Sequence, residues 1–273
     1  PASQAYPAFN SVLALNSTQY LLGSLGEGLW FWSFEGQPQA PVRLISGLPE
    51  LDQAAIFGLA QDSNGLLWIG AQGGLFKAGL QGGQLNAAQA ISMLLPQGEA
   101  RNISDLQLNT QDELLLATEQ GVLIASVHQL ALHSLAEPLL GKASVSALAQ
   151  WQDVMWVGTH DSGVLVLDKQ EQQVGHYQVG DRQFSLPSNR VQDMYLDQHG
   201  MLWIATDKGL SSLNVHNGEW VTAYPLEAHV KCLNYKRSGI LSIAQDRDRN
   251  RMLFAGTGLL HVLDRTTGQF STI

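Results

Sequence analysis

A short pattern that recurs six times constrains this 273-residue chain more than any other feature of its sequence. Each copy has two or three apolar residues, then a Gly or Ala, then usually a small polar residue, as in Leu202-Trp203-Ile204-Ala205-Thr206. The Gly or Ala of the copies lies at positions 23, 70, 117, 158, 205 and 256. The copies are therefore 41 to 51 residues apart and cover nearly the whole chain. Repeats of this length are typical of solenoids, propellers and other arrays.

The unit over residues 191–224 shows the internal layout of the repeat. Its four apolar segments lie at 191–196, 202–206, 210–215 and 219–224. Short polar turns rich in Gly and Asn separate them, and these residues tolerate the positive φ that tight hairpins need. No segment of the unit has a helical period over ten residues. The unit therefore predicts a four-stranded antiparallel meander.

A single four-stranded sheet cannot bury both of its faces, so it must stack on copies of itself. Four strands in a unit of 40 to 50 residues are typical of a β-propeller, whereas a β-solenoid and a two-sheet sandwich are the alternatives. We predict an all-β chain folded as one β-propeller domain over residues 1–273, with about six four-stranded blades. Seven blades are expected instead if one is degenerate or missing. The predicted blades are approximately 10–52, 53–99, 100–142, 143–188, 189–236 and 237–273.

Three tryptophans occupy the same position of the repeat. Trp68, Trp156 and Trp203 are predicted to lie on the second strand of their blades and to pack between adjacent blades. Burial of so large a side chain contributes on the order of 1.5–3 kcal/mol or more. The Gly or Ala that follows lets the neighbouring sheet approach closely. We therefore interpret these tryptophans as structural and not as ligand-binding residues.

The last unit admits two strand registers. In the preferred one, Ile240–Asp246 forms its first strand and Arg251–Thr257 its second. In the alternative, Val230–Tyr235 comes first and Ile240–Asp246 second. Residues 1–9 are expected to add a strand to the last blade and so to remove an exposed sheet edge.

Charge and composition exclude several classes of partner. The net charge is −9, which argues against nucleic acid or an anionic membrane surface, because both require a basic patch. No apolar run approaches the roughly 18 residues that span a bilayer, so no direct membrane insertion is expected. The single cysteine, Cys232, excludes an internal disulfide framework. Because the chain begins with Pro1, we expect a processed or excised piece, with any signal peptide or anchor outside it.

Two units resemble the two-component-regulator propeller repeat closely. They are Asp62 to Gly70 with Gly73-Gly74-Leu75 behind it, and Asp197 to Thr206 with Lys208-Gly209-Leu210 behind it; Leu263 to Phe270 resembles the end of such a unit. The resemblance implies the periplasmic or extracellular sensor part of an inner-membrane receptor. A transmembrane helix and a histidine kinase, diguanylate cyclase or DNA-binding output module usually follow in that family. Full receptors commonly carry two seven-bladed propellers, a number from which six copies depart.

One face of the predicted propeller gathers the candidate ligand-binding residues. The turns between second and third strands and the loops between blades share this face, and convergent loops over a central funnel are the default ligand site. Their polar groups of both signs suit a polar small molecule or a sugar, whereas ordinary solvent-exposed turns are the alternative interpretation. The candidates are Glu27, Gln72, Arg101, Glu119, His160, Asp161, Arg182, Arg190, Asp207 and Lys208.

Standard catalytic signatures are absent from the sequence. There is no Gly-x-Ser-x-Gly elbow, no phosphate-cradling Gly loop and no His-Glu-x-x-His. We therefore predict a non-catalytic domain with no cofactor and no metal site. The candidate partners are a small molecule or carbohydrate, further receptor domains, a second propeller and a second copy of the chain.

Two rival functions remain open on the same scaffold. One is a lyase or hydrolase with its active site at the funnel, for which His160 and Asp161 are the first candidates. The other is a protein-interaction scaffold of the WD-repeat kind, which a flat apolar face without a pocket would favour.

Overall fold

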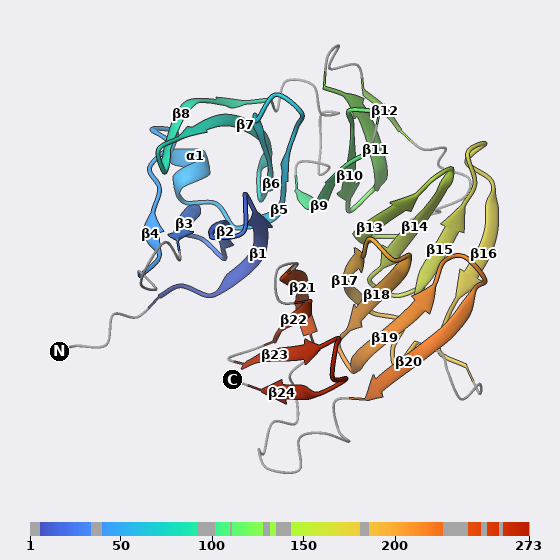
Figure 1. The fold of residues 1–273 in the computed structure, drawn as a ribbon. Coiled ribbons are helices and arrows are strands. Elements are labelled where there is room, and N and C mark those ends of the chain that lie inside the picture. Colours follow the sequence, from blue (N-terminus) through green and yellow to red (C-terminus); the bar gives the residue numbers. More distant parts are fainter. Residues whose placement is uncertain are drawn as a thin grey trace. The chain divides into compact units, whose positions relative to one another are not determined.

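Six four-stranded antiparallel sheets make up the described part of the chain (Figure 1). The computed structural model describes residues 6–33, 40–91, 102–109, 111–127, 132–134, 143–180, 186–225, 240–246, 250–256 and 259–272. Among these residues the only helix is the four-residue α1, Pro49–Asp52, and no helix is long and apolar enough to cross a membrane. The prediction of an all-β propeller with six blades is confirmed.

The chain divides into two compact units, residues 1–134 and 135–273, with three blades in each. In the first unit, blade 1 contains β1 (Phe9–Ala14), β2 (Gln19–Ser24), β3 (Leu29–Ser33) and β4 (Val42–Arg43). Blade 2 contains β5 (Ile56–Gln61), β6 (Leu67–Ala71), β7 (Gly74–Gln81) and β8 (Gln84–Ala90). Blade 3 contains β9 (Ile103–Leu108), β10 (Glu113–Thr118), β11 (Gly121–Ser126) and β12 (Leu132–Ser134).

The second unit repeats this layout. Blade 4 contains β13 (Val145–Trp151), β14 (Val154–Thr159), β15 (Val164–Leu167) and β16 (Gln173–Tyr177). Blade 5 contains β17 (Val191–Leu196), β18 (Met201–Thr206), β19 (Gly209–Asn214) and β20 (Glu219–Pro225). Blade 6 contains β21 (Ile240–Asp246), β22 (Arg251–Gly256), β23 (Leu259–Asp264) and β24 (Phe270–Thr272). The preferred register of the last unit is confirmed by β21 and β22, and the alternative first strand at 230–235 lies outside the described residues.

Within each unit, successive blades pack through their first strands. The first strand β5 lies against both β1 and β9 in the first unit, and β17 lies against both β13 and β21 in the second. The Gly of the repeat makes this approach feasible. A Cβ at Gly70 would lie 2.6 Å from Cγ2 of Ile103 in the next blade, and one at Gly158 would lie 2.7 Å from Cγ1 of Val191.

The three tryptophans of the repeat lie in the clusters that join neighbouring blades. Trp68 of β6, 1% exposed, packs with Ile103 and Leu114 of blade 3. Trp203 of β18 packs with Phe254 of β22 in blade 6. Trp156 of β14 shares a cluster with residues of blade 5. The apolar seams between sheets are thus where the repeat buries its largest side chains.

The expectation that residues 1–9 join the last blade falls partly outside the described residues, which begin at Tyr6. Phe9 begins β1 and pairs with Ser24 of β2, and the carbonyl of Ala8 accepts a hydrogen bond from the Leu25 backbone N–H at 2.9 Å. These residues therefore extend the first strand of blade 1.

Candidate functional site

The antiparallel meander places two kinds of turn at opposite ends of each blade. Turns between second and third strands lie at one end, and turns joining first to second and third to fourth strands lie at the other. We call these the 2–3 turns and the 1–2 and 3–4 turns. The predicted ligand-binding residues belong to the 2–3 turns and to the loops between blades.

In the first unit, the described candidates are all solvent-exposed. Glu27, Gln72 and Glu119 each occupy the 2–3 turn of a different blade. The Gln72 turn is tied to the loop before blade 3, because Oδ1 of Asn102 accepts a hydrogen bond from the Gly73 backbone at 3.1 Å. Arg101, the remaining candidate of this unit, lies outside the described residues.

Blade 1 fixes its 2–3 turn with an arginine that the sequence analysis did not select. Arg43 donates from Nε to the carbonyl of Glu27 at 3.0 Å and from Nη2 to the carbonyl of Asp52 in α1 at 2.6 Å. The turn is thereby joined to the connection that leads into blade 2.

In the second unit, the structure brings two candidates together through the backbone. The N–H of Asp207 donates to the carbonyl of Arg190 at 3.3 Å, and Lys208 follows in the same exposed turn. His160 and Asp161 begin the 2–3 turn of blade 4, where His160 is half-buried and Asp161 exposed. Arg182 lies outside the described residues.

Buried hydroxyl groups brace these turns from within. Ser24, Thr118, Thr159 and Thr206 occupy the last position of the second strand in their blades and are nearly inaccessible to solvent. Each hydroxyl donates to the carbonyl of the glycine that closes the turn, at 2.9 Å in all four cases. Each also accepts a backbone N–H from within the turn, including that of Lys208 at 3.3 Å. The turns therefore present their polar side chains on fixed backbones.

The 2–3 turn of blade 4 has additional supports from its neighbours. Nε2 of His176 lies 2.6 Å from the carbonyl of Ser162, and the carbonyl of Asn189 accepts the Gly163 N–H at 2.9 Å. The side chain of Asn189 also accepts the N–H of Val179 at 2.7 Å. His176 and Asn189 thus hold the turn that presents His160 and Asp161.

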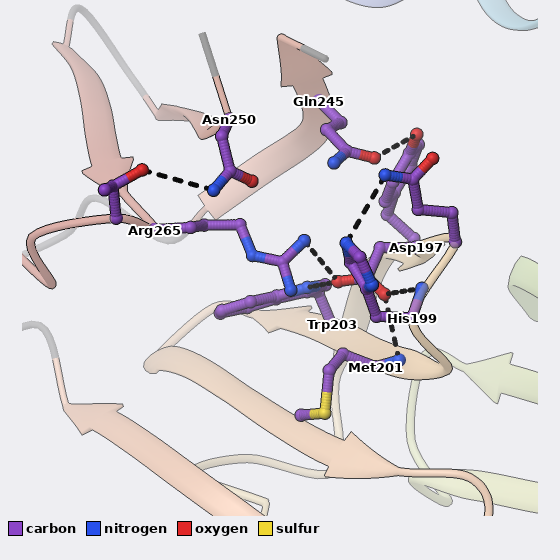
Figure 2. A network of polar contacts seen from close by, with 10 residues as sticks. Asp197, His199, Met201, Trp203, Gln245, Asn250 and Arg265 are labelled. Atoms are coloured by element: carbon purple, nitrogen blue, oxygen red, sulfur yellow. Dashed lines mark hydrogen bonds and ion pairs between the residues drawn. The ribbon is translucent and has the colours of Figure 1, made fainter. Parts of the chain in front are cut away.

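The opposite end of the blades contains a network of hydrogen bonds and an ion pair around Asp197, which the sequence analysis did not predict. Asp197, in the 1–2 turn of blade 5, accepts backbone N–H groups of His199 and Met201 at Oδ1, at 2.8 and 3.1 Å. Its Oδ2 accepts the indole N–H of Trp203 at 3.2 Å (Figure 2). Arg265 reaches the same oxygen from blade 6, with Nη1 at 2.9 Å, as an ion pair and not as a straight hydrogen bond.

Blade 2 repeats the aspartate and tryptophan of this arrangement. Asp62 accepts the backbone N–H groups of Asn64 and Leu66 at 2.9 and 3.0 Å, and the indole N–H of Trp68 at 3.0 Å. The sequence signal was the constant interval of six residues from Asp to Trp. In blade 4, Gln150 stands six residues before Trp156. Within the described part of the chain, neither Oε1 of Gln150 nor Nε1 of Trp156 has a hydrogen-bond partner.

Two cavities lie in the first unit at this end of the blades. One, of about 680 Å³, is lined by residues of blades 1 and 2 that include Asn16, Gln19, Phe31 and Gly83. The other, of about 470 Å³, lies between blades 2 and 3 and is lined by Asp62, Trp68, Lys77, Asn86 and Val127 among others. Neither is lined by a ligand-binding candidate selected from the sequence.

Among the described residues, three titratable groups have shifted pKa values, and one of them, Tyr177, lies beside the 2–3 turn of blade 4. Backbone hydrogen bonds from Thr267 above all, and from Thr266, lower the pKa of the Asp264 carboxyl at the end of β23. Burial lowers the pKa of His261 on β23 and raises that of Tyr177 on β16. Among the described residues, no group of three or more His, Cys, Asp and Glu side chains is arranged to hold a metal ion.

Comparison with known proteins supports the repeat and the fold. Residues 185–208 match the family model of the two component regulator propeller, which confirms the resemblance seen in the fifth unit. No curated protein gave a match.

Solved structures show the same fold at low identity. The extracellular domain of the putative hybrid two component system BT4673 from B. thetaiotaomicron is 21% identical, with a TM-score of 0.60 over 80% of this chain and 27% of that one. That of BT3049 from the same organism is 18% identical, with a TM-score of 0.66 over 98% and 35%. The β-propeller domain of Cps50 (Swd1) from Myceliophteria thermophila is 12% identical, with a TM-score of 0.68 over 99% and 88%. This chain thus spans about a third of the length of the two extracellular domains.

Proposed function

We propose that this chain, which carries the two-component regulator propeller repeat, is the extracytoplasmic sensing propeller of a bacterial transmembrane signalling receptor. It binds a ligand or partner at the 2–3 turns and performs no chemistry of its own. Signal transfer follows from a changed arrangement of a dimer or of neighbouring domains, because a sheet-built propeller changes little internally.

The observation that carries the proposal is the bracing of the 2–3 turns. Recognition of a polar ligand is strongest when the charged groups are held in place before binding, because less conformational entropy is then lost. Asp207 and Lys208 are exposed charges of opposite sign on a turn fixed by Thr206 and by the Arg190 carbonyl. Such a turn suits a ligand with both donor and acceptor groups, such as a sugar or an amino acid.

The binding claim is tested by a thermal-shift screen of the purified chain with sugars, amino acids and peptides. A ligand present at 100 times its dissociation constant stabilises the folded state by about 2.7 kcal/mol. Lys208→Gln should weaken the binding of any ligand found in this way. The matched control is Lys169→Gln, because Lys169 is an exposed lysine of a 3–4 turn at the opposite end of its blade. Equal weakening by both variants would contradict binding at the 2–3 turns.

The receptor claim is tested on the complete gene product in its own cell. A transmembrane segment and an output module are expected in that product. A transcriptional or cyclic-nucleotide readout should respond to the ligand and lose sensitivity in Lys208→Gln. A complete product without a membrane segment would contradict the receptor claim and leave the binding claim to its own test.

The non-catalytic claim has a separate test at His160 and Asp161. The isolated chain should show no turnover of the ligands identified by the screen. Turnover that His160→Ala abolishes would replace the sensor with a propeller lyase or hydrolase.

A further inference from the structure

The seam between blades 2 and 3 is equivalent to the seam between blades 5 and 6, and the two differ in the residue that faces the buried aspartate. In each, the aspartate of a 1–2 turn faces the first residue after the third strand of the next blade. That residue is Val127 in blade 3 and Arg265 in blade 6. The backbone establishes the equivalence, since Val127 N–H donates to the Asp112 carbonyl at 3.1 Å and Arg265 N–H to the Asn250 carbonyl at 3.0 Å.

Between blades 5 and 6, the buried carboxylate is neutralised by the chain itself. The Asp197 side chain is fully buried, and the Arg265 side chain, 16% exposed, extends past Trp203 to reach it (Figure 2). Between blades 4 and 5, both positions are neutral, with Trp151 at the register position of the aspartate and Val215 in place of the arginine. At the first of these seams a carboxylate faces a guanidinium, and at the second both facing residues are uncharged, so neither seam holds an unpaired charge at this position.

Between blades 2 and 3, the carboxylate of Asp62 has no arginine at the equivalent position. Asp62 is only 8% exposed and accepts the same three N–H groups as Asp197, but Val127 offers no cation. Within the described ranges, no cation forms an ion pair with Asp62. Burying a carboxylate without a cation is costly, whereas a charge-assisted contact to a guanidinium lowers that cost.

The space that Arg265 fills in one seam is open in the other. The cavity of about 470 Å³ is lined by Asp62 and Trp68 on one side and by Val127 on the other. Its third wall is the β7–β8 hairpin, through Gly79 and Asn86. Strand β7 has eight residues, whereas β19 and β23 have six, so this hairpin extends further along the seam.

We propose that this cavity is a binding site for an alkyl guanidinium group, which takes the position at Asp62 that the Arg265 side chain takes at Asp197. The ligand is either a free molecule or an arginine side chain of a peptide. Asp62 Oδ2 pairs with the guanidinium, and the side chain of Asn86 lies at the rim to accept a further N–H. The site lies at the end of the blades opposite to the 2–3 turns, so this inference does not depend on the proposed function.

Lys77 is the one competing cation among the residues described as lining this cavity. It lies directly across from Trp68 in the β6–β7 ladder. Its ammonium repels a cationic ligand and also competes for Asp62. Lys77→Gln should therefore tighten guanidinium binding, and binding should nevertheless be measurable in the unaltered chain.

The test is an NMR titration that follows the tryptophan indole N–H signals, with Trp68 assigned from the variant Trp68→Phe. Agmatine and arginine amide are the free probes, and a short arginine peptide with blocked ends is the peptide probe. Citrulline amide, whose urea side chain is uncharged, is the control for arginine amide. The Trp68 indole signal should shift saturably with the guanidinium probes. Citrulline amide should bind at least about tenfold more weakly than arginine amide, because the charge-assisted contact is lost. The Trp203 signal should not respond, since Arg265 already occupies Asp197.

Two exchanges of side chains provide matched variants. Val127→Arg places a guanidinium at Asp62 and should abolish the response of Trp68. Arg265→Val opens the equivalent position and should make Trp203 responsive to the same probes. Tighter binding of agmatine than of the peptide would identify a free molecule as the ligand, and the reverse would identify an arginine side chain.

Several outcomes would overturn the proposal. They are no saturable shift of Trp68, an equal response to citrulline amide and arginine amide, an unchanged response in a folded Val127→Arg chain, and binding that appears only in Lys77→Gln. If Val127→Arg does not fold, the comparison of charged and neutral probes on the unaltered chain still decides.

Discussion

Trp203 of blade 5 and Phe254 of blade 6 lie on the second strands of consecutive blades and pack against each other across the seam. Their ring centroids are 5.6 Å apart and the ring planes are tilted by 51°. Phe254 also stacks on Phe270 of the outermost strand, at 6.0 Å. An aromatic chain therefore runs from the middle of blade 5 to the outer edge of blade 6.

This relationship predicts a large loss of stability in Trp203→Ala. Truncating a buried aromatic in a core typically costs about 3–5 kcal/mol, through lost transfer free energy and the cavity left behind. Urea denaturation followed by circular dichroism measures the change in the free energy of unfolding. Val221→Ala on β20 is the control, because Val221 is 53% exposed and should change stability by no more than about 0.5 kcal/mol. Similar costs for both variants would contradict the role of the seam.

Asp197→Asn should destabilise the chain more than Asp62→Asn. Both substitutions place an amide donor where the indole N–H needs an acceptor, which costs about 1–3 kcal/mol. Only Asp197→Asn also leaves a mostly buried guanidinium without its counter-charge, and breaking a buried pair costs about 3–5 kcal/mol. Adding Arg265→Met to Asp197→Asn should recover part of the loss in a double-mutant cycle. Equal losses of unfolding free energy in the two single variants would show that the ion pair with Arg265 does not contribute to stability.

Gly200→Ala and Gly218→Ala form a matched pair in which the backbone is alike and the available space differs. Their φ angles are +75° and +71°, so each alanine carries a left-handed strain of about 1–2 kcal/mol. A Cβ at Gly200 would overlap the ring of His216, whereas a Cβ at Gly218 meets nothing within 4 Å. We expect a greater loss for Gly200→Ala, partly relieved by His216→Ala. An equal loss in thermal denaturation would mean that His216 moves aside without cost.

The buried His261 should make stability depend on pH below its ordinary pKa of 6.5. The ring is 3% exposed and stacks on Phe270 at 5.5 Å, and its burial lowers the pKa in the folded state. The unfolded chain therefore binds the proton more readily, so its contribution to stability is present above pH 6.5 and is lost as the pH falls. Chemical denaturation at pH 7.5 and pH 5.5 should show a smaller pH-dependent loss for His261→Phe than for the unaltered chain. The difference between the two isolates His261 from the other histidines.

Much of the architecture follows from local pattern. The interval between copies, the alternation within segments and the glycine-rich turns predict the four strands of each blade and their order. The 2–3 turns bring Glu27, Gln72, Glu119, Asp207 and Lys208 to the surface as expected, because a hairpin turn at a sheet end must face solvent. The ligand-binding role of these residues stays a prediction.

The sequence did not predict which residues of neighbouring blades face each other. The interval from Asp62 to Trp68 is visible along the chain, but nothing local indicates that residue 127 faces Asp62 or that residue 265 faces Asp197. These partners come from the next blade, more than 60 residues away, and only the stacking of sheets sets them side by side.

The sequence by itself determined that the chain forms repeated four-stranded sheets with aromatic seams, since strand periodicity and turn chemistry are local properties. The tertiary structure alone decided which buried carboxylate is neutralised and which faces an open cavity. That outcome depends on the sign of a charge and the length of a hairpin that belong to the neighbouring sheet.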